Sequence, residues 1–320
     1  MTETRPSRLQ TFPIAWFAMI MGLGGLTIAW NKAEQLLNLP LQISPYLLTL
    51  STLLFFGLSV VYAIKIVRFR AAASSEWNHP VKMSFVPTFS VALLVLATAW
   101  LDVNPGYSRL LWLFGASIHL VLTLHILSQW IQQPKFELLH LNPAWFIPVM
   151  GNILVPIAGV YHAPIWVSWF FFSIGIVFWP LLLTIIFYRV IFHGSLPERL
   201  LPTLFILIAP PSVGFVAYLK LAGQIDALAN ILYFSGLFFT LLLFVQVRSF
   251  LRLRFYLSWW AYSFPLAAIT VASLSMFHYT GEPSFLHLSG LLLGIATAVI
   301  AGLFARTFIG VLRKEICIEE

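Results

Sequence analysis

Ten long apolar stretches, separated by short polar or charged segments, dominate the pattern of hydrophobic and polar positions along this chain. A helix that crosses a bilayer needs about 20 consecutive, mostly apolar residues. Proline and glycine in the intervening segments mark the turns. The pattern predicts ten membrane-spanning helices, over residues 12–30, 45–67, 83–101, 107–131, 143–160, 165–188, 200–219, 228–247, 257–278 and 284–312.

Two of these boundaries need a separate argument. Residues 138–188 contain no Asp, Glu, Lys or Arg, which is long enough for two spans, and Tyr161-His162-Ala163-Pro164 provides the turn between them. The first stretch follows Arg5 and Arg8 and resembles the start of a signal peptide. Because it is long and lacks a small-residue cleavage pattern, we predict that it is the first membrane helix.

Composition supports a membrane location. Of the 320 residues, 60% are hydrophobic and only 9% are charged, whereas a soluble domain carries about 25% charge. A surface built from so few ionisable groups must face lipid. We therefore predict an all-α protein in which residues 1–320 form a single transmembrane domain. The net charge of +7 does not indicate a nucleic-acid partner, because the basic residues fall between the apolar spans.

The distribution of basic residues predicts the topology. With ten spans both termini lie on the same side, and of the 18 Lys and Arg only Lys32, Arg109 and Lys220 fall on the other side. Cytoplasmic loops are enriched in Lys and Arg. We therefore expect a multi-pass protein of the cell (inner) membrane with both termini in the cytoplasm.

Proline recurs within the odd-numbered helices, usually close to an aromatic residue. The pattern appears as Phe12-Pro13, Phe85-Val86-Pro87, Phe146-Ile147-Pro148, Ala209-Pro210-Pro211 and Phe264-Pro265. A proline inside a helix removes one backbone hydrogen bond and bends the axis. Taken singly, these are ordinary kinks, since proline is common in membrane helices. Their repetition on odd helices favours a central ring around a pore.

These segments also resemble a known family. The resemblance rests on residues 16–25 (WFAMIMGLGG), 79–85 (HPVKMSF), 150–152 (MGN), 209–218 (APPSVGFVAY) and 259–265 (WWAYSFP), which span nearly the whole chain in order. The chain resembles the bacterial tellurite-resistance TehA proteins, the plant slow-type anion channels and the fungal malate permeases. Bacterial relatives tend to carry a proline near Ile20, where this chain has none, so a kink there would rest on Gly22, Gly24 and Gly25.

The resemblance implies an architecture and a gate. Five helical hairpins would place the odd helices around a pore and the even helices outside, and three subunits would form a homotrimer with one pore each. The family's gating phenylalanine, which blocks the pore midway, corresponds to Phe264 here. The default alternative is that Phe264, one of 29 phenylalanines, only packs.

Small, hydroxyl-bearing and aromatic side chains are the candidates for the pore wall. The odd helices carry no Lys or Arg in their middle, and conduction requires sites weak enough for an ion to leave. Packing between helices, where small residues are favoured, is the alternative role for each. The predicted pore-lining residues are Phe17, Gly24, Phe85, Pro87, Thr88, Phe146, Pro148, Asn152, Pro210, Ser212, Ser263, Pro265 and Thr270, with Ser90 as a further candidate.

These observations predict a gated channel for small monovalent anions such as chloride or nitrate. A proton-coupled transporter of malate-like C4-dicarboxylates, or a tellurite-related transporter, is the alternative. A doubly charged substrate should need a cation at mid-membrane, and the odd helices offer none. His119 and His125 are six residues apart, do not share a helix face and are expected to pack or to form hydrogen bonds. We find no catalytic, phosphate-binding or metal-binding motif, so no enzyme, cofactor or metal site is expected.

Overall fold

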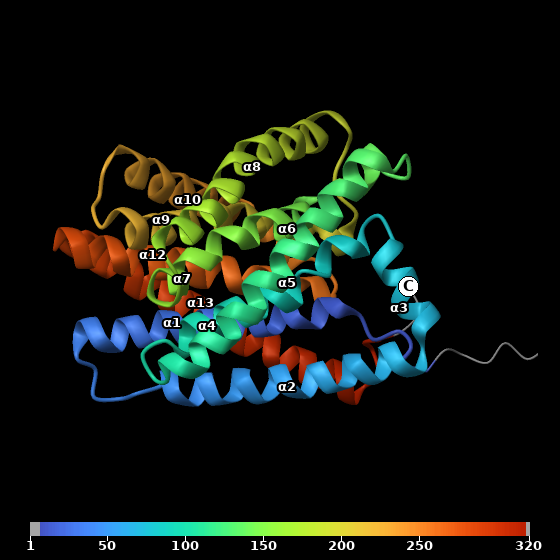
Figure 1. Ribbon diagram of the computed structural model, residues 1–320, viewed down its shortest axis with the longest axis horizontal. Coiled ribbons are helices and arrows are strands. Elements are labelled where there is room, and N and C mark those ends of the chain that lie inside the picture. The colour runs from blue at the N-terminus through green and yellow to red at the C-terminus, as the bar shows by residue number, and fades with distance from the viewer. Residues whose placement is uncertain (1–6, 318–320) are drawn as a thin grey trace, which may run out of the picture.

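The structure, a computed structural model, describes residues 7–317 and is all-helical over that range (Figure 1). Ten of its helical spans are long and apolar enough to cross a membrane, which confirms the predicted number and order. Their bounds are Ile14–Leu37, Ser44–Arg68, Lys82–Trp100, Pro105–Gln132, Pro143–His162, Ile165–Phe192, Glu198–Ala222, Ala227–Val245, Leu257–Thr280 and Pro283–Leu312. We refer to them as spans 1 to 10.

The even-numbered spans are single α-helices. Even Pro180, inside α8, does not interrupt its helix. Their apolar side chains point outward in large number, including Phe56, Phe114, Phe170 and Phe238, as expected for a surface in contact with lipid. The five helices are α2 (Ser44–Arg68), α5 (Pro105–Gln132), α8 (Ile165–Phe192), α10 (Ala227–Val245) and α13 (Pro283–Leu312).

Each odd-numbered span instead begins with a 3₁₀ segment. Prolines lie in or beside several of these segments, as at Pro13, Pro87, Pro143 and Pro202, and a residue without an N–H cannot continue the regular α-helical bonding. The segments are η1 (Ile14–Trp16) before α1 (Phe17–Leu37), η2 (Lys82–Phe85) before α4 (Thr88–Trp100), η4 (Pro143–Phe146) before α6 (Ile147–Met150), η5 (Gly151–Leu154) and α7 (Val155–His162), η6 (Glu198–Ile208) before α9 (Ala209–Ala222), and η7 (Leu257–Tyr262) before α12 (Ser263–Thr280).

Burial separates the spans into two layers. Within an apolar stretch of 18 residues in each span, 72% to 83% of the residues are buried in the odd spans, against 22% to 44% in the even spans. The odd spans form a closed ring, in which α1 packs on α4 and α12, α7 packs on α4 and α9, and α9 packs on α12. Each even helix packs on the odd span that precedes it in sequence. The odd spans therefore surround the molecular axis and the even spans cover them.

Both ends of the described chain lie on one side of the bundle, which we call the terminal side. Thr11 Oγ1 donates a 2.6 Å hydrogen bond to the carbonyl of Cys317, and Arg8 donates one of 3.2 Å to the carbonyl of Ile316. Arg5 lies outside the described residues. The short α3 (Arg70–Asn78), η3 (Leu138–His140) and α11 (Val247–Leu251) also belong to connections on this side. We call the other side the opposite side.

A buried ion pair fixes the start of span 1 on the terminal side. Lys65 Nζ lies 2.6 Å from Glu76 Oε2, and both residues are almost fully buried. Glu76 Oε1 accepts the backbone N–H of Ile14 at 2.7 Å, while Lys65 donates to the carbonyl of Phe12 at 2.7 Å. The pair thus satisfies two backbone groups at the point where span 1 begins, which balances part of the cost of burying two charges.

The glycines of α1 serve close packing. Helix α1 runs without a break from Phe17 to Leu37. A Cβ atom on Gly22 would lie 2.1 Å from Ser263 Oγ, and one on Gly25 would lie 3.3 Å from Cδ2 of Phe264. Only a residue without a side chain lets α1 approach α12 this closely.

Candidate pore through the ring of odd spans

Two cavities lie along the axis of the ring. The larger has a volume of about 80 Å³ and the smaller about 40 Å³. Among the described residues, every side chain that lines either cavity comes from an odd span, and all five odd spans contribute to both. The cavities are thus enclosed by the ring and are separated from lipid by the even helices.

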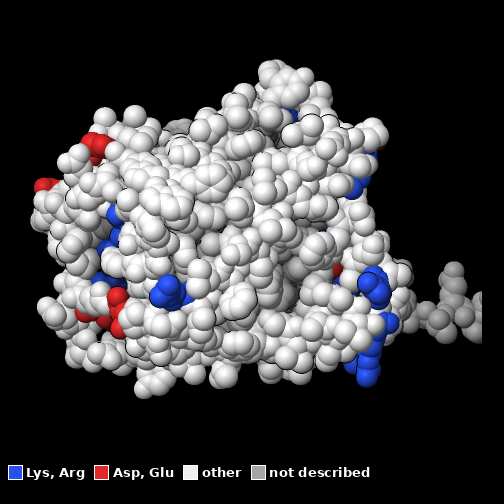
Figure 2. Space-filling view, viewed as in Figure 1, with Lys and Arg blue, Asp and Glu red and all other residues white. Residues whose placement is uncertain are grey.

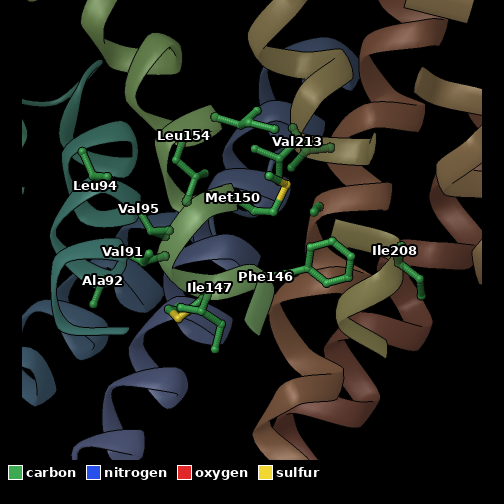
Figure 3. Close-up of a cluster of buried hydrophobic side chains, with 14 of the residues drawn as sticks. Val91, Ala92, Leu94, Val95, Phe146, Ile147, Met150, Leu154, Ile208 and Val213 are labelled. Carbon is green, nitrogen blue, oxygen red and sulfur yellow. The ribbon is translucent and has the colours of Figure 1, made fainter. Parts of the chain in front are cut away.

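The lining residues form one stripe on each odd span. They recur at intervals of three or four, which is the spacing of one face of a helix. Clear examples are Ala15, Ala18, Met21, Gly25 and Ile28 in span 1, Thr88, Val91, Val95 and Thr98 in span 3, and Ile206, Ala209, Val213 and Val216 in span 7. Figure 3 shows part of this wall, with Val91 and Val95 from α4, Leu154 from η5 and Val213 from α9.

Three side chains border both cavities and therefore lie between them. They are Leu154, Val213 and Phe264. Leu154 and Val213 are buried, whereas Phe264 is only partly buried. The ring of Phe264 packs beside Gly25, which leaves room for it next to α1. Phe264 is the largest of the three side chains that separate the two cavities.

The walls of both cavities carry no charge. No Asp, Glu, Lys, Arg or His lines either cavity within the described residues, and the hydroxyl groups in the lining belong to Thr88, Ser258 and Thr98. Each of these hydroxyls donates to a backbone carbonyl, as in the 2.6 Å bond from Thr88 to Phe85 and the 3.1 Å bond from Thr98 to Leu94. The walls therefore present mainly apolar surface and hydroxyl oxygens to the interior.

The predicted pore residues fall into two groups. Phe85, Thr88, Phe146, Pro210, Phe264 and Pro265 line the cavities. The others lie outside the lining and pack between helices or along the backbone. These are Phe17, Gly24, Pro87, Pro148, Asn152, Ser212, Ser263 and Thr270, as well as Ser90.

The polar residues of the second group are engaged elsewhere. Asn152 Nδ2 donates to Thr123 Oγ1 at 3.0 Å, so its side chain turns toward α5. Ser212, Ser263 and Thr270 donate to backbone carbonyls three or four residues earlier in their own spans. Phe17 is fully buried and packs edge-on against Phe89, with ring centroids 5.0 Å apart. Small polar residues are here used for packing between close helices.

Sequence reasoning missed the small and branched apolar residues that form most of the lining, such as Ala18, Val91, Leu154 and Val213. No single one differs from an ordinary core residue. Their spacing was a usable signal. In each span the lining residues recur every three or four positions, on a helix face that includes or adjoins the prolines of that span. Extending the helix face of Phe264 and Pro265 in both directions gives Ala261 and Ala268, which both line cavities.

A histidine lies directly behind the wall. His119 of α5 is fully buried, and its Nδ1 lies 2.9 Å from Ser90 Oγ. A Cβ atom on Gly151, which lines the larger cavity, would lie 2.2 Å from the His119 ring. The His119 Nε2 has no hydrogen-bond partner among the described residues. As expected from the sequence, His119 packs in the bundle, although it does so one layer from the cavity. His125, which was also expected to pack or to form hydrogen bonds, is instead exposed on the outer face of α5.

Charges gather at the two ends of the molecule. Figure 2 shows Lys, Arg, Asp and Glu at both ends of the long axis with a wide uncharged surface between them. On the terminal side His79 lies close to Lys82, His140 and Arg199. Burial, together with these positive neighbours, holds the pKa of His79 below its usual value. Within residues 7–317 no cluster of His, Cys, Asp and Glu is arranged to hold a metal ion.

Comparison with known proteins agrees with this architecture. The voltage-dependent anion channel family (SLAC1) matches residues 11–308. An uncharacterised transporter of Methanocaldococcus jannaschii is 29% identical over 284 residues, which cover 81% of this chain and 83% of that protein. The S-type anion channel SLAH2 of Arabidopsis thaliana is 29% identical over 95% of this chain, which spans only 58% of the plant protein. The tellurite resistance protein TehA homolog of Haemophilus influenzae is 26% identical over 87% of this chain and 84% of its own length.

The match extends over nearly all ten spans, and the chain therefore belongs to the voltage-dependent anion channel family. It is a multi-pass membrane protein of a family of anion channels and transporters that includes the slow-type channels and the TehA proteins. The resemblance found in the sequence segments is thus confirmed.

Proposed function

We propose that this protein is a gated channel for small monovalent anions such as chloride and nitrate, and that Phe264 closes its pore. The observation that carries this proposal is the pair of uncharged cavities along the ring axis, interrupted at Phe264. In this proposal the two cavities are the pore interior, and the stripes of the five odd spans are its wall.

The chemistry of the wall favours weakly hydrated, singly charged ions. A fixed cation in the pore would hold an anion tightly, whereas conduction needs binding weak enough for the ion to leave. An apolar wall with few hydroxyls gives such weak binding, but it offers little compensation for lost hydration. The cost of dehydration grows steeply with charge, so a monovalent anion passes where a dicarboxylate does not.

The arrangement of the gate follows from the same surfaces. An apolar ring across a narrow passage blocks ions sterically and keeps the passage dry. Pro265 restricts the backbone conformation of Phe264, which lies in the first turn of α12. Opening requires the ring to leave the axis, and the open space on both sides of Phe264 gives it room to rotate.

The orientation and assembly belong to the same proposal. The terminal side carries most of the Lys and Arg, so we place it, with both termini, in the cytoplasm of a cell whose inner membrane holds the protein. The homotrimer with one pore per subunit that the family resemblance implies is part of this proposal.

A proton-coupled carrier of C4-dicarboxylates is the second candidate, and His119 is the observation that favours it. This buried, titratable side chain lies beside the cavity wall, and such residues inside membranes often mark proton pathways. A carrier of that kind should transport malate and respond to a pH gradient. The channel proposal predicts neither property.

Currents through the purified protein in planar bilayers test the two candidates. Chloride, nitrate and malate are compared at equal concentration, with and without a pH difference across the membrane. The channel proposal expects chloride and nitrate currents that are insensitive to the pH gradient, with little malate current. A malate flux that depends on the pH gradient, with little chloride current, would replace it with the carrier.

A further inference from the structure

Two lysines continue the stripes that line the cavities. Lys32 follows the lining residue Ile28 by four positions in α1, and Lys220 follows the lining residue Val216 by four positions in α9. Residues four apart lie on the same face of a helix. Both lysines are therefore placed one turn beyond the smaller cavity, at its mouth on the opposite side of the membrane.

The two lysines lie on helices that are not neighbours. In the ring, α12 separates α1 from α9 on one side, and α4 and α7 separate them on the other. Both lysines, however, extend stripes that face the axis of the ring. Two residues placed in this way face the same opening from different parts of the ring. Lys32 is partly buried there and Lys220 is exposed.

The acidic groups nearby are held by hydrogen bonds of their own. Asp102 attracts Lys32, but its Oδ2 already accepts hydrogen bonds from Asn31 at 3.0 Å and Gln35 at 3.1 Å. The carboxylate of Glu34 accepts the N–H and the hydroxyl of Ser44 at the start of α2. Among the described residues, neither lysine is part of an ion pair with an N···O distance within 4.0 Å.

Lys220 is also oriented by an aromatic residue. Its Nζ donates to the Tyr161 hydroxyl at 2.9 Å and lies 5.2 Å from the centre of the Tyr161 ring. This contact uses one of its three N–H groups and leaves the others for a ligand. Among the described residues the opposite side has only three Lys or Arg, and two of them lie at this mouth.

We propose that Lys32 and Lys220 form a capture site for a small monovalent anion, chloride or nitrate, at the mouth on the opposite side. The inference rests on the proposed channel function. It concerns the step in which the anion binds at the mouth, before it loses water to enter the cavities. The cavities offer no charge, so the two ammonium groups supply the attraction that brings an anion to the dry path. Because this mouth is open to water, binding stays weak enough for the anion to continue inward.

Anion uptake by membrane vesicles of both orientations tests the site. In vesicles whose bath faces this mouth, the double variant Lys32→Gln/Lys220→Gln should take up low external chloride about tenfold more slowly than the wild type, because focused fields raise local ion concentrations by roughly that factor or more. The half-saturating chloride concentration should rise. Both differences should shrink at high ionic strength, because the screening length falls from about 8 Å at 0.15 M salt to about 3 Å at 1 M.

Two matched variants separate charge from structure. Arg109→Gln removes the remaining cation of this side, which lies on the outer helix α5, and should leave uptake unchanged. Lys32→Arg/Lys220→Arg keeps both charges and should retain wild-type uptake at low chloride. The amount of folded protein in each preparation is measured by size-exclusion chromatography, and uptake is expressed per folded molecule.

The outcomes distinguish the capture site from the channel itself. If the wild type passes no chloride or nitrate, the proposed function fails and this inference with it. If the wild type conducts and the double Gln variant keeps the same concentration dependence, the capture site alone is wrong. A loss of uptake that the Arg pair shares, or that high ionic strength does not reduce, would also overturn it, because the lysines would then act through packing.

Discussion

Replacement of Phe264 by alanine should open the pore. The ring is one of three side chains between the cavities, and its removal joins a space of about 80 Å³ to one of about 40 Å³. Water needs only about 10–15 Å³ per molecule in such a volume, so a continuous file of water can then form. An anion that keeps one more hydrogen bond to water at the constriction gains about 1.5–3 kcal/mol. That range corresponds to a current roughly ten- to 150-fold larger at 25 °C.

The same substitution should be tolerated by the fold. Truncating a fully buried phenylalanine to alanine costs about 3–5 kcal/mol. Phe264 already borders open space on two sides and has fewer contacts to lose, so we expect a cost of less than about 3 kcal/mol. Phe264→Leu, which keeps more bulk, should produce a smaller leak.

Phe17→Ala provides the matched control. Phe17 is fully buried, lies outside the cavity lining and packs against Phe55, Tyr62 and Phe89. Its truncation should cost the full 3–5 kcal/mol or so and add no current. Both variants are compared in planar bilayers at matched amounts of folded protein. A well-folded Phe264→Ala variant with wild-type or lower conductance would show that the gate lies elsewhere.

Three further predictions concern the surroundings of the pore. Gly25→Ala brings a methyl group to 3.3 Å from the Phe264 ring and 3.0 Å from Ala267 in the next turn of α12. Single-channel recordings should then show an altered open probability at intact expression. Unchanged gating would mean that the position of the ring does not depend on this contact. Glu76→Gln leaves Lys65 buried without its carboxylate partner and should lower the free energy of unfolding by about 3–5 kcal/mol, whereas a normal thermal midpoint in detergent would contradict that role. In a Cys317→Ser background, an impermeant thiol reagent applied to intact cells should label Glu282→Cys and leave Glu137→Cys unlabelled until the membrane is permeabilised, and the reverse pattern would invert the topology.

The spans could be predicted because a bilayer imposes a length and a composition on every crossing segment. The charge-free run of residues 138–188 divided correctly at the predicted turn, which lies between α7 and α8. The 3₁₀ segments were not foreseen. Prolines signal a break in α-helical bonding, but whether the chain then kinks or tightens depends on neighbours that local sequence does not contain.

The candidate site was only partly visible in the sequence, for a similar reason. Proline and its neighbouring aromatic residue marked Phe85, Phe146 and Phe264, because a bend in a ring helix exposes the side chains beside it. Ser212 and Thr270 were predicted to line the wall from their polarity, yet they lie outside the cavity lining. Like the lining residue Thr88, they bond to a carbonyl of their own span, so a hydroxyl does not reveal which way its residue faces. A hydroxyl in an apolar medium needs a partner, and the nearest carbonyl of the same helix is usually available.

The closure of the ring by α1 and α12 has a consequence for biogenesis. Because the first and ninth spans are neighbours, the axis stays open on one flank until the ribosome has delivered nearly the whole chain. During that interval the stripes destined for the interior face lipid or water. Their lack of charged groups lets these faces rest in hydrocarbon without a large penalty. The uncharged surface that we propose lines the pore therefore also lets the incomplete chain remain in the membrane until α12 has been inserted.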